Sequence, residues 1–440
     1  MFNKKKLGLF SIMVAAMMFT VGCSDDDDST PISPSPENSK IRVIHSSYDA
    51  PAVDILVDDA VAVSSLEFGQ SSGYATVNAG TRNIKVNAAG SSTNVFEANL
   101  PIAANKEFTI IAANELASFE PLIVEDFRSP NSSKAKVRFV HASPDAPAVD
   151  IKVGSGMSAP VFSNADFRTI TNYVEVDEGS YQFVVTAAGS TNEVLVFNAA
   201  TLQNGQVYTV IANGTFDPSD QYPFAVRVFV DNDPGNAFVD LTVATTNVKV
   251  IHASPDAPGV DVLVDDVVVN SAPLTFPNST SYLQPIAGTR NIKVNAAGSS
   301  NSVIEADVTF MSDAFYSVFA VNDLNNIEPL VLEDDLTAPA AGKAHVRFIH
   351  LSPDAPAVDI TLTDGTVVFG NKIFKESTPF TPLDAGTYDL EVRLAGTSTT
   401  VLPLNGIVLE AGKIYTVFAR GFVNGSGNQS LNAEIIVNLQ

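Results

Sequence analysis

Four histidines lie in a recurring motif whose residue types could take part in catalysis or metal binding. The segment RVIHSSYDAPAVDI begins at Arg42, and close copies begin at Arg138, Lys249 and Arg347. Histidine, serine and aspartate are the residue types of a hydrolytic triad, and histidine with aspartate can hold a metal ion. The candidate residues are His45, Asp49, Asp54, His141, Ser143, Asp145, Asp150, His252, Ser254, Asp256, Asp261, His350, Ser352, Asp354 and Asp359.

The spacing within the motif disfavours a hydrolase. Serine and aspartate follow the histidine by two and four residues in one tight loop, whereas a triad needs its three groups to converge in a set geometry. Proline follows the serine in three copies, and Tyr48 stands there in the first. We therefore expect no catalytic residue and no enzymatic activity. A hydrolytic enzyme is the least favoured alternative.

The residues before each motif histidine predict a strand that ends in a structural corner. Alternate residues of a strand share a face, so Ile41, Val43 and His45 point toward one apolar side and Arg42 toward the other. A histidine at the edge of a core needs partners for its ring nitrogens, and serine and aspartate are typical partners in turns. We interpret the histidine and the Ser-Pro-Asp-Ala-Pro loop as one hydrogen-bonded corner that joins two strands.

Metal binding has weak support in the sequence. Each repeat carries one motif histidine, and the fifth histidine, His345, is predicted to face away from His350. Asp58-Asp59 and Asp265-Asp266 follow two of the Val-Asp-Ile or Val-Asp-Val segments and could add oxygen ligands for calcium. Turn residues at the same place in the other two repeats indicate hairpin turns instead. We expect no cofactor, with weakly bound Ca²⁺ between domains as an alternative.

The elements around the motif predict four tandem all-β domains. The motif histidines recur roughly every 100 residues, which is the size of a small domain. The first repeat shows seven short β-like segments separated by turn residues, which favours β-sandwich domains of immunoglobulin or transthyretin-like layout with about seven strands each. The segment GTRNIKVNAAGSS occurs at 80–92 and again at 288–300, so a two-domain unit was duplicated. The expected domains, in a row, are 40–130, 134–244, 247–338 and 343–440.

The N-terminus predicts export and a lipid anchor. Lys4, Lys5 and Lys6 precede an uncharged apolar run that is too short for a comfortable membrane span and fits a signal peptide over 1–23. The run ends at Cys23, the one cysteine of the chain, in a context that resembles the lipobox of bacterial lipoproteins. By that resemblance Cys23 is lipidated and the destination is the outer membrane, facing the periplasm or the cell surface. Residues 24–39 are acidic and rich in Pro and Ser and are expected to form a disordered tether.

Charge excludes one class of partner. The formal net charge is −24, from 49 acidic and 25 basic residues, so the surface repels nucleic-acid phosphates. The single cysteine rules out an internal disulfide.

The motif His-x-Ser-Pro-Asp-Ala-Pro-x-Val-Asp-Val resembles the hallmark of the bacterial family called domain of unknown function 4397. The resemblance covers nearly all of the chain after residue 40, and it implies an exported protein with several domain copies and no assigned activity. Together with the anchor, it favours a non-catalytic lipoprotein of the cell envelope with a structural or binding role toward a protein or a polysaccharide. The alternative is a calcium-rigidified, adhesin-like surface rod.

Overall fold

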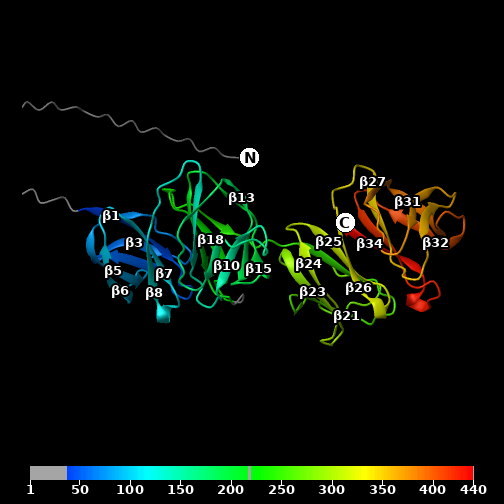
Figure 1. The fold of residues 1–440 in the computed structure, drawn as a ribbon, viewed down its shortest axis with the longest axis horizontal. Helices are drawn as coiled ribbons and strands as arrows, with labels where there is room; N and C mark the ends of the chain where they lie inside the picture. Colours follow the sequence, from blue (N-terminus) through cyan, green and yellow to red (C-terminus); the bar gives the residue numbers. More distant parts are fainter. Residues whose placement is uncertain (1–36, 217–219, 440) are drawn as a thin grey trace, which may run out of the picture.

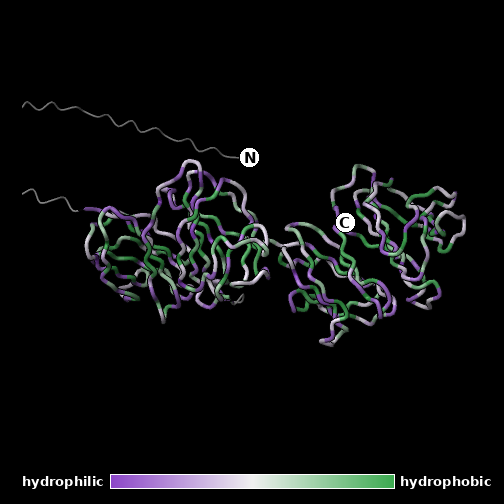
Figure 2. Tube along the Cα trace, viewed as in Figure 1, coloured by the Kyte–Doolittle hydropathy of each residue, from purple (hydrophilic) through white to green (hydrophobic). Residues whose placement is uncertain are grey.

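The computed structural model describes residues 37–216 and 220–439. Strands dominate this part of the chain, together with three short 3-10 helices, so the prediction of an all-β fold with tandem β-sandwich domains is confirmed. The polar and apolar residues that alternate along the tube in Figure 2 reflect sheets with one face on a core.

The first repeat contains eight strands in two sheets, ordered β4-β1-β7-β8 and β3-β2-β5-β6. Strands β1 and β7 run parallel, and the core between the sheets includes Ile41, Val43, Ile55, Ile84 and Ile110. The elements are β1 (Asn38–His45), β2 (Val53–Val57), β3 (Ala60–Leu66), β4 (Ala75–Asn78), β5 (Gly80–Ala88), β6 (Asn94–Ile102), β7 (Glu107–Ala113), η1 (Leu116–Ser118) and β8 (Glu120–Glu125).

The strand that the sequence analysis missed in this repeat is β3. It follows the two-residue turn Asp58-Asp59, and both residues have positive φ angles, 51° and 66°. Two consecutive left-handed residues form the turn type that matches the twist of a hairpin. The hairpin interpretation of Asp58-Asp59 is therefore confirmed. Strand β3 escaped notice because most of its residues are small and exposed.

The other repeats keep the two packed sheets and the parallel pairing of the first strand, but repeat 2 has one five-stranded sheet and an additional two-stranded sheet, and repeat 3 has one three-stranded sheet. Repeat 2 contains β9 (Ala135–His141), β10 (Val149–Val153), β11 (Phe162–Ala165), β12 (Val174–Val176), β13 (Gly179–Tyr181), β14 (Phe183–Ala187), β15 (Glu193–Val196), β16 (Ala200–Leu202), β17 (Val207–Asn213), β18 (Ala225–Val230) and β19 (Phe238–Leu241). Repeat 3 contains β20 (Asn247–His252), β21 (Val260–Val264), β22 (Val267–Val268), β23 (Gly288–Ala296), β24 (Ser302–Phe310), β25 (Phe315–Val321), η2 (Leu324–Asn326) and β26 (Glu328–Glu333). Repeat 4 contains β27 (Lys343–His350), β28 (Val358–Leu362), β29 (Val367–Lys372), β30 (Thr381–Asp384), β31 (Gly386–Leu394), β32 (Thr400–Leu409), β33 (Ile414–Arg420), η3 (Gly427–Gln429) and β34 (Asn432–Leu439).

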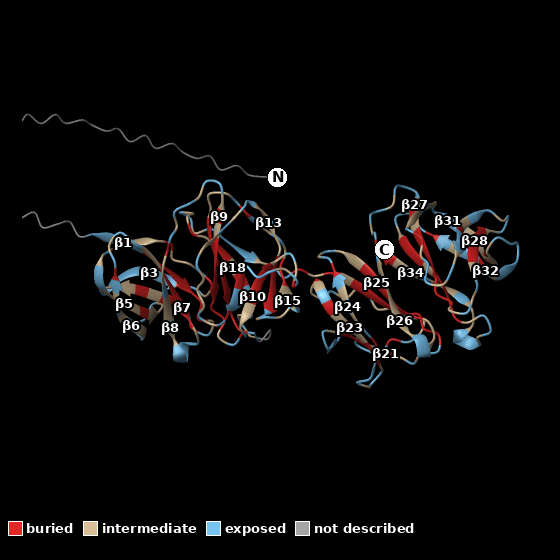
Figure 3. Cartoon of the chain, in the orientation of Figure 1, coloured by how far each residue is buried: buried red, intermediate tan, exposed pale blue. Residues whose placement is uncertain are grey.

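The repeats are packed in pairs, face to face, which a simple row of domains does not predict. Repeats 1 and 2 share an apolar cluster that includes Ile44, Ile111, Val140, Ile211 and Phe229, all between 0% and 1% exposed. These residues lie on β1, β7, β9, β17 and β18, the sheets that face each other in one lobe of Figure 1. The residues of β1 from Ile41 to His45, and those of β9 from Val137 to His141, are thus all buried, which means that both strand faces are covered. Figure 3 shows buried residues in red along the strands of this lobe.

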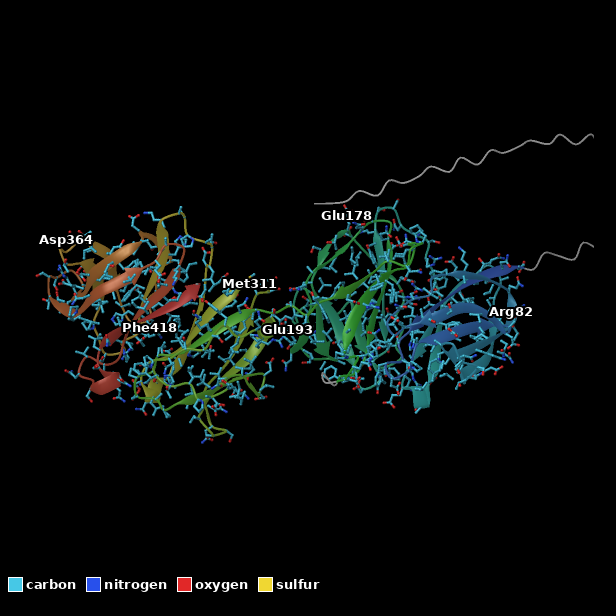
Figure 4. All side chains as sticks on the ribbon, turned by 180° about the vertical axis from the view of Figure 1, so that it is seen from behind. Arg82, Glu178, Glu193, Met311, Asp364 and Phe418 are labelled. Carbon is cyan, nitrogen blue, oxygen red and sulfur yellow. The ribbon has the colours of Figure 1, made fainter. Side chains whose placement is uncertain are left out.

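Repeats 3 and 4 repeat this arrangement. Their shared cluster contains Ile251, Phe319, Ile349, Leu351 and Phe418, each fully buried. The two pairs meet at a smaller contact that includes Val184, Val196, Ala244 and Ala287. Glu193, labelled in Figure 4 where the two lobes meet, accepts a hydrogen bond from the backbone N–H of Thr289 at 2.7 Å.

Candidate functional site: the motif corners and the buried ion-pair clusters

Each motif histidine is buried and donates to the carbonyl of the second motif proline. The distances from Nε2 to the proline oxygen are 3.0 Å for His45, 3.3 Å for His141, 3.0 Å for His252 and 3.0 Å for His350. A carbonyl oxygen only accepts, so Nε2 carries the proton and the neutral ring leaves Nδ1 as an acceptor. In repeat 1, Nδ1 accepts from the backbone N–H of Ser47 at 3.4 Å.

Each motif strand pairs with a parallel strand of its sheet. The motif serine and aspartate bind the loop that follows this parallel strand. The Ser143 hydroxyl donates to the carbonyl of Gly214 at 2.7 Å, and Ser352 donates to Gly421 at 2.6 Å. The aspartates accept from backbone N–H groups in the same loops: Asp49 from Leu116, Asp145 from Phe216, Asp256 from Leu324 and Asp354 from Val423. Ser254 is fully buried in its corner. We call this set of His, Ser and Asp in each repeat the motif corner.

The motif corner lacks the geometry of a hydrolytic triad. The backbone N–H of Ser47, and not its hydroxyl, faces the histidine ring, and the serine hydroxyls lie 3.4 to 3.5 Å from the motif aspartates. A triad needs the hydroxyl on the ring nitrogen that removes its proton. The motif residues that the sequence singled out are thus brought together as a hydrogen-bonded corner.

One other segment carries the pattern of a nucleophile elbow. Residues 69–73 read Gly-Gln-Ser-Ser-Gly and lie in the connection between β3 and β4. An elbow joins a strand to a helix, which is absent at this place. The Ser71 hydroxyl accepts from the backbone N–H of Gly73 at 3.4 Å. The segment therefore forms a local turn without the context of a nucleophile.

The recurring aspartates of the Val-Asp segments hold two loops together. Asp54 accepts from the backbone N–H groups of Ser65 at 2.8 Å and Gly90 at 2.9 Å, and these bonds lower its pKa. Asp150 and Asp359 each make the corresponding two bonds, and Asp261 accepts from the backbone N–H of Gly298 at 2.8 Å. Within residues 37–216 and 220–439, no three His, Cys, Asp or Glu side chains are grouped so as to hold a metal ion.

The arginines opposite the motif histidines form a second site, a buried ion-pair cluster between repeats 1 and 2. Arg42 of repeat 1 pairs with Asp231 of repeat 2 at 2.6 Å, and Arg138 of repeat 2 pairs with Asp126 of repeat 1 at 2.6 Å. All four side chains are between 0% and 3% exposed. The arginine of each repeat pairs with the aspartate of the other, so the two repeats are related like the halves of a two-fold dimer.

Hydroxyl groups complete the cluster. Tyr74 and Thr109 donate to the Asp126 carboxylate at 2.8 and 2.6 Å. Tyr173 and Thr209 do the same for Asp231 at 2.8 and 2.6 Å. Each buried carboxylate therefore has a cation from the other repeat and two hydroxyl donors from its own, as buried charges require.

The cluster between repeats 3 and 4 differs at four positions. Arg347 pairs with Asp334 at 2.7 Å, as in the first pair. Lys249 stands in place of the other arginine, Asn438 in place of the other aspartate, Phe380 in place of one tyrosine and Ser317 in place of one threonine. Burial opposes the charge of Arg42, yet Asp231, Tyr74 and Asp126 outweigh it and raise its pKa. With one carboxylate fewer, burial prevails and lowers the pKa of both Arg347 and Lys249.

Sequence reasoning placed Arg42 and its counterparts on the face opposite the motif histidine but gave them no role, and it did not single out Asp126, Asp231 or Asp334. A signal was present. Both faces of the first strand are apolar, with Ile41 and Val43 on one side and Ile44 on the other. A strand of this kind is buried on both faces, and a charge within it needs a buried partner.

The motif histidines are expected to make stability fall as the pH drops below about 6.5. Burial lowers the pKa of all four from 6.5, so the unfolded chain binds protons that the folded chain excludes. Their contribution is fully present above pH 6.5 and is lost as the pH falls toward the folded pKa, with a slope of at most about 1.4 kcal/mol per pH unit for each histidine. Urea unfolding between pH 7.5 and 5.5 measures this slope.

A variant of one motif histidine checks that assignment. His350→Gln is expected to reduce the slope of stability against pH. Equal slopes in the wild-type chain and in the His350→Gln variant would contradict the assignment.

The predicted signal peptide 1–23, with Cys23, and most of the tether 24–39 lie outside the described residues. Among residues 37–216 and 220–439, no helix is both long and apolar enough to span a membrane.

No curated protein matches the chain. Among solved structures, one match is the Bacillus anthracis TIE protein, with 10% sequence identity, a TM-score of 0.17, and coverage of 87% of this chain and 68% of that chain. A family model described as "Domain of unknown function (DUF4397)" matches residues 39–152, 155–242 and 246–361, which confirms the resemblance drawn from the motif. The chain belongs to the DUF4397 family.

Proposed function

We propose that this protein is a non-catalytic lipoprotein of the cell envelope, anchored to the outer membrane through Cys23, which displays two pairs of β-sandwich domains for a structural or binding role. Its partner is a protein or a polysaccharide, and nucleic acid is excluded by the net charge of −24. The observation that carries the proposal is the motif corner. In all four repeats the motif histidine bonds the carbonyl of a motif proline through Nε2, and the motif aspartate accepts from a backbone N–H of a second loop.

The pairing of the repeats supports the same role. Two interfaces with apolar clusters and buried ion pairs fix the relative positions of neighbouring repeats. A rigid module at the end of a tether presents its surface with little loss of conformational freedom on binding. The oxygens of the recurring aspartates accept backbone N–H groups, so the proposal includes no bound calcium. A melting temperature that rises in millimolar calcium would favour the adhesin-like rod instead.

Assays of the purified protein test the non-catalytic part. Residues 37–440 are expected to give no turnover with panels of ester, glycoside and peptide substrates. Turnover that is abolished by His350→Gln would overturn the proposal. Binding of the same protein to purified envelope polysaccharides and proteins, measured by calorimetry, identifies the partner class.

The anchor is tested in the native cell. Replacing Cys23 by serine is expected to abolish incorporation of labelled palmitate and to release the protein from the membrane fraction, because no other lipidation site of this kind exists in the sequence. A Ser24→Ala variant is the control and is expected to keep the label. Membrane retention of the Cys23→Ser variant would argue against the anchor.

A further inference from the structure

Lys249 and Asn438 occupy the places of an ion pair in the other half of the molecule. In the first pair of repeats, Arg42 on β1 meets Asp231, which follows β18. Lys249 lies over the ring of Tyr282 at 4.5 Å, as Arg42 lies over Tyr74 at 4.8 Å. Asn438, the second member of the pair, corresponds to Asp231. Asn438 accepts from the Thr416 hydroxyl at 2.7 Å, as Asp231 accepts from Thr209 at 2.6 Å. A buried guanidinium and carboxylate are thus replaced by an amine and an amide.

We propose that Lys249 and Asn438 form an intramolecular amide bond that links β20 of repeat 3 to β34 of repeat 4. The amine of Lys249 attacks Cγ of Asn438. The Nζ–Cγ bond forms, the Cγ–Nδ2 bond breaks, and one proton passes from Nζ to Nδ2, which leaves as ammonia. The reaction needs no oxidant and no external group.

Lys249 has the properties of a nucleophile in this reaction. Its side chain is buried, with 6% of the residue exposed, and its Nζ donates to the carbonyl oxygen of Val437 at 3.2 Å. Val437 immediately precedes Asn438, so the amine lies next to the residue that it would attack. Burial lowers the pKa of Lys249, which increases the fraction of uncharged, nucleophilic amine.

The surroundings of Asn438 polarise its amide and can carry the proton. The Thr416 hydroxyl donates to Oδ1 at 2.7 Å, where negative charge develops during attack. On the other side, Nδ2 donates to the Asp334 carboxylate at 3.2 Å and to the Tyr282 hydroxyl at 3.0 Å. The Asp334 carboxylate is therefore in contact with the leaving group and can relay to it the proton that Nζ gives up. Apolar residues of the interface, such as Phe319 and Phe418, keep water away.

The first pair of repeats serves as an internal comparison. Arg42 and Asp231 form a charged pair at 2.6 Å, and a guanidinium that stays protonated is no nucleophile. Lysine in place of arginine and asparagine in place of aspartate occur together, at facing positions, between repeats 3 and 4. This cluster has one buried carboxylate, Asp334, where the first cluster has two. An amide bond there would remove the charge of Lys249, which has no carboxylate of its own in the cluster.

Mass spectrometry of peptides from the full-length protein tests the proposal. A digest of the full-length protein is expected to contain the peptides of Lys249 and Asn438 joined, about 17 Da lighter than their sum, because one ammonia is lost. The Lys249→Arg variant, which restores the residue type of the other repeats, is expected to show the two peptides separately. Lys293→Arg, at a lysine outside the cluster whose side chain is 21% exposed, is the control and is expected to keep the link.

Two results would overturn the proposal. One is the presence of the two peptides at their unlinked masses throughout the wild-type sample. The other is a loss of about 17 Da that persists in Lys249→Arg, which would place the bond elsewhere. Because the decisive measurement is made on the wild-type chain, a variant that folds poorly does not affect it.

Discussion

Replacing Arg138 by alanine is expected to destabilise the first pair of repeats by about 3–5 kcal/mol, which is the usual cost of removing one partner of a buried ion pair. Asp126 would keep its hydroxyl donors, Tyr74 and Thr109, but this buried carboxyl group would lose its cation. For a unit of about 200 residues this corresponds to a fall in melting temperature of about 6–20 °C. Calorimetry of residues 37–440 measures the shift.

An exposed pair of the same residue types provides the control. Arg82 lies 2.9 Å from Asp58, with the two side chains 26% and 46% exposed, so Arg82→Ala is expected to cost about 1 kcal/mol or less. The double variant Arg138→Met with Asp126→Leu is expected to be more stable than Arg138→Ala, since it leaves no unpaired charge. If Arg138→Ala and Arg82→Ala melt alike, the buried cluster does not hold the repeats together.

Repeat 1 alone, produced as residues 37–130, is expected not to persist as a folded monomer. Separation from repeat 2 exposes Ile44, Ile111 and Leu122, and each large side chain forfeits about 1.5–3 kcal/mol of burial. The sum is comparable to the whole stability of a small domain, about 5–15 kcal/mol. Arg42 and Asp126 would lose their partners as well. Circular dichroism and size-exclusion chromatography report the outcome.

The two-repeat fragment 37–245 is the matched control. It retains the apolar cluster and both ion pairs and is expected to be a monomer with one cooperative unfolding transition. A folded, monomeric repeat 1 with the stability of the pair would contradict this. It would show that each sandwich is an independent unit and that the pairing adds nothing to folding.

Local patterns in the sequence predicted the main features of each repeat. Period-2 alternation in Ile41, Val43 and His45 indicated a strand with one face on the core, and Asp58-Asp59 indicated a hairpin turn. The structure confirms both. These features depend on residues close in sequence, whose conformational preferences are fixed by local sterics and by the spacing of apolar side chains. The short strand β3 escaped because its small residues carry little of that signal.

The contacts between repeats were decided by the tertiary structure. Arg42 and Asp231 are far apart in sequence, and no pattern in either segment indicates that these two residues form a pair. Which sheet faces meet is set by the summed burial of side chains such as Ile44 and Phe229, and only then does a buried charge acquire its counterion. The sequence by itself determined the sandwiches and their motif corners. The pairing of the repeats, and the meeting of Lys249 with the end of β34, required the folded chain, because both arise from surfaces that come together only after the strands have formed.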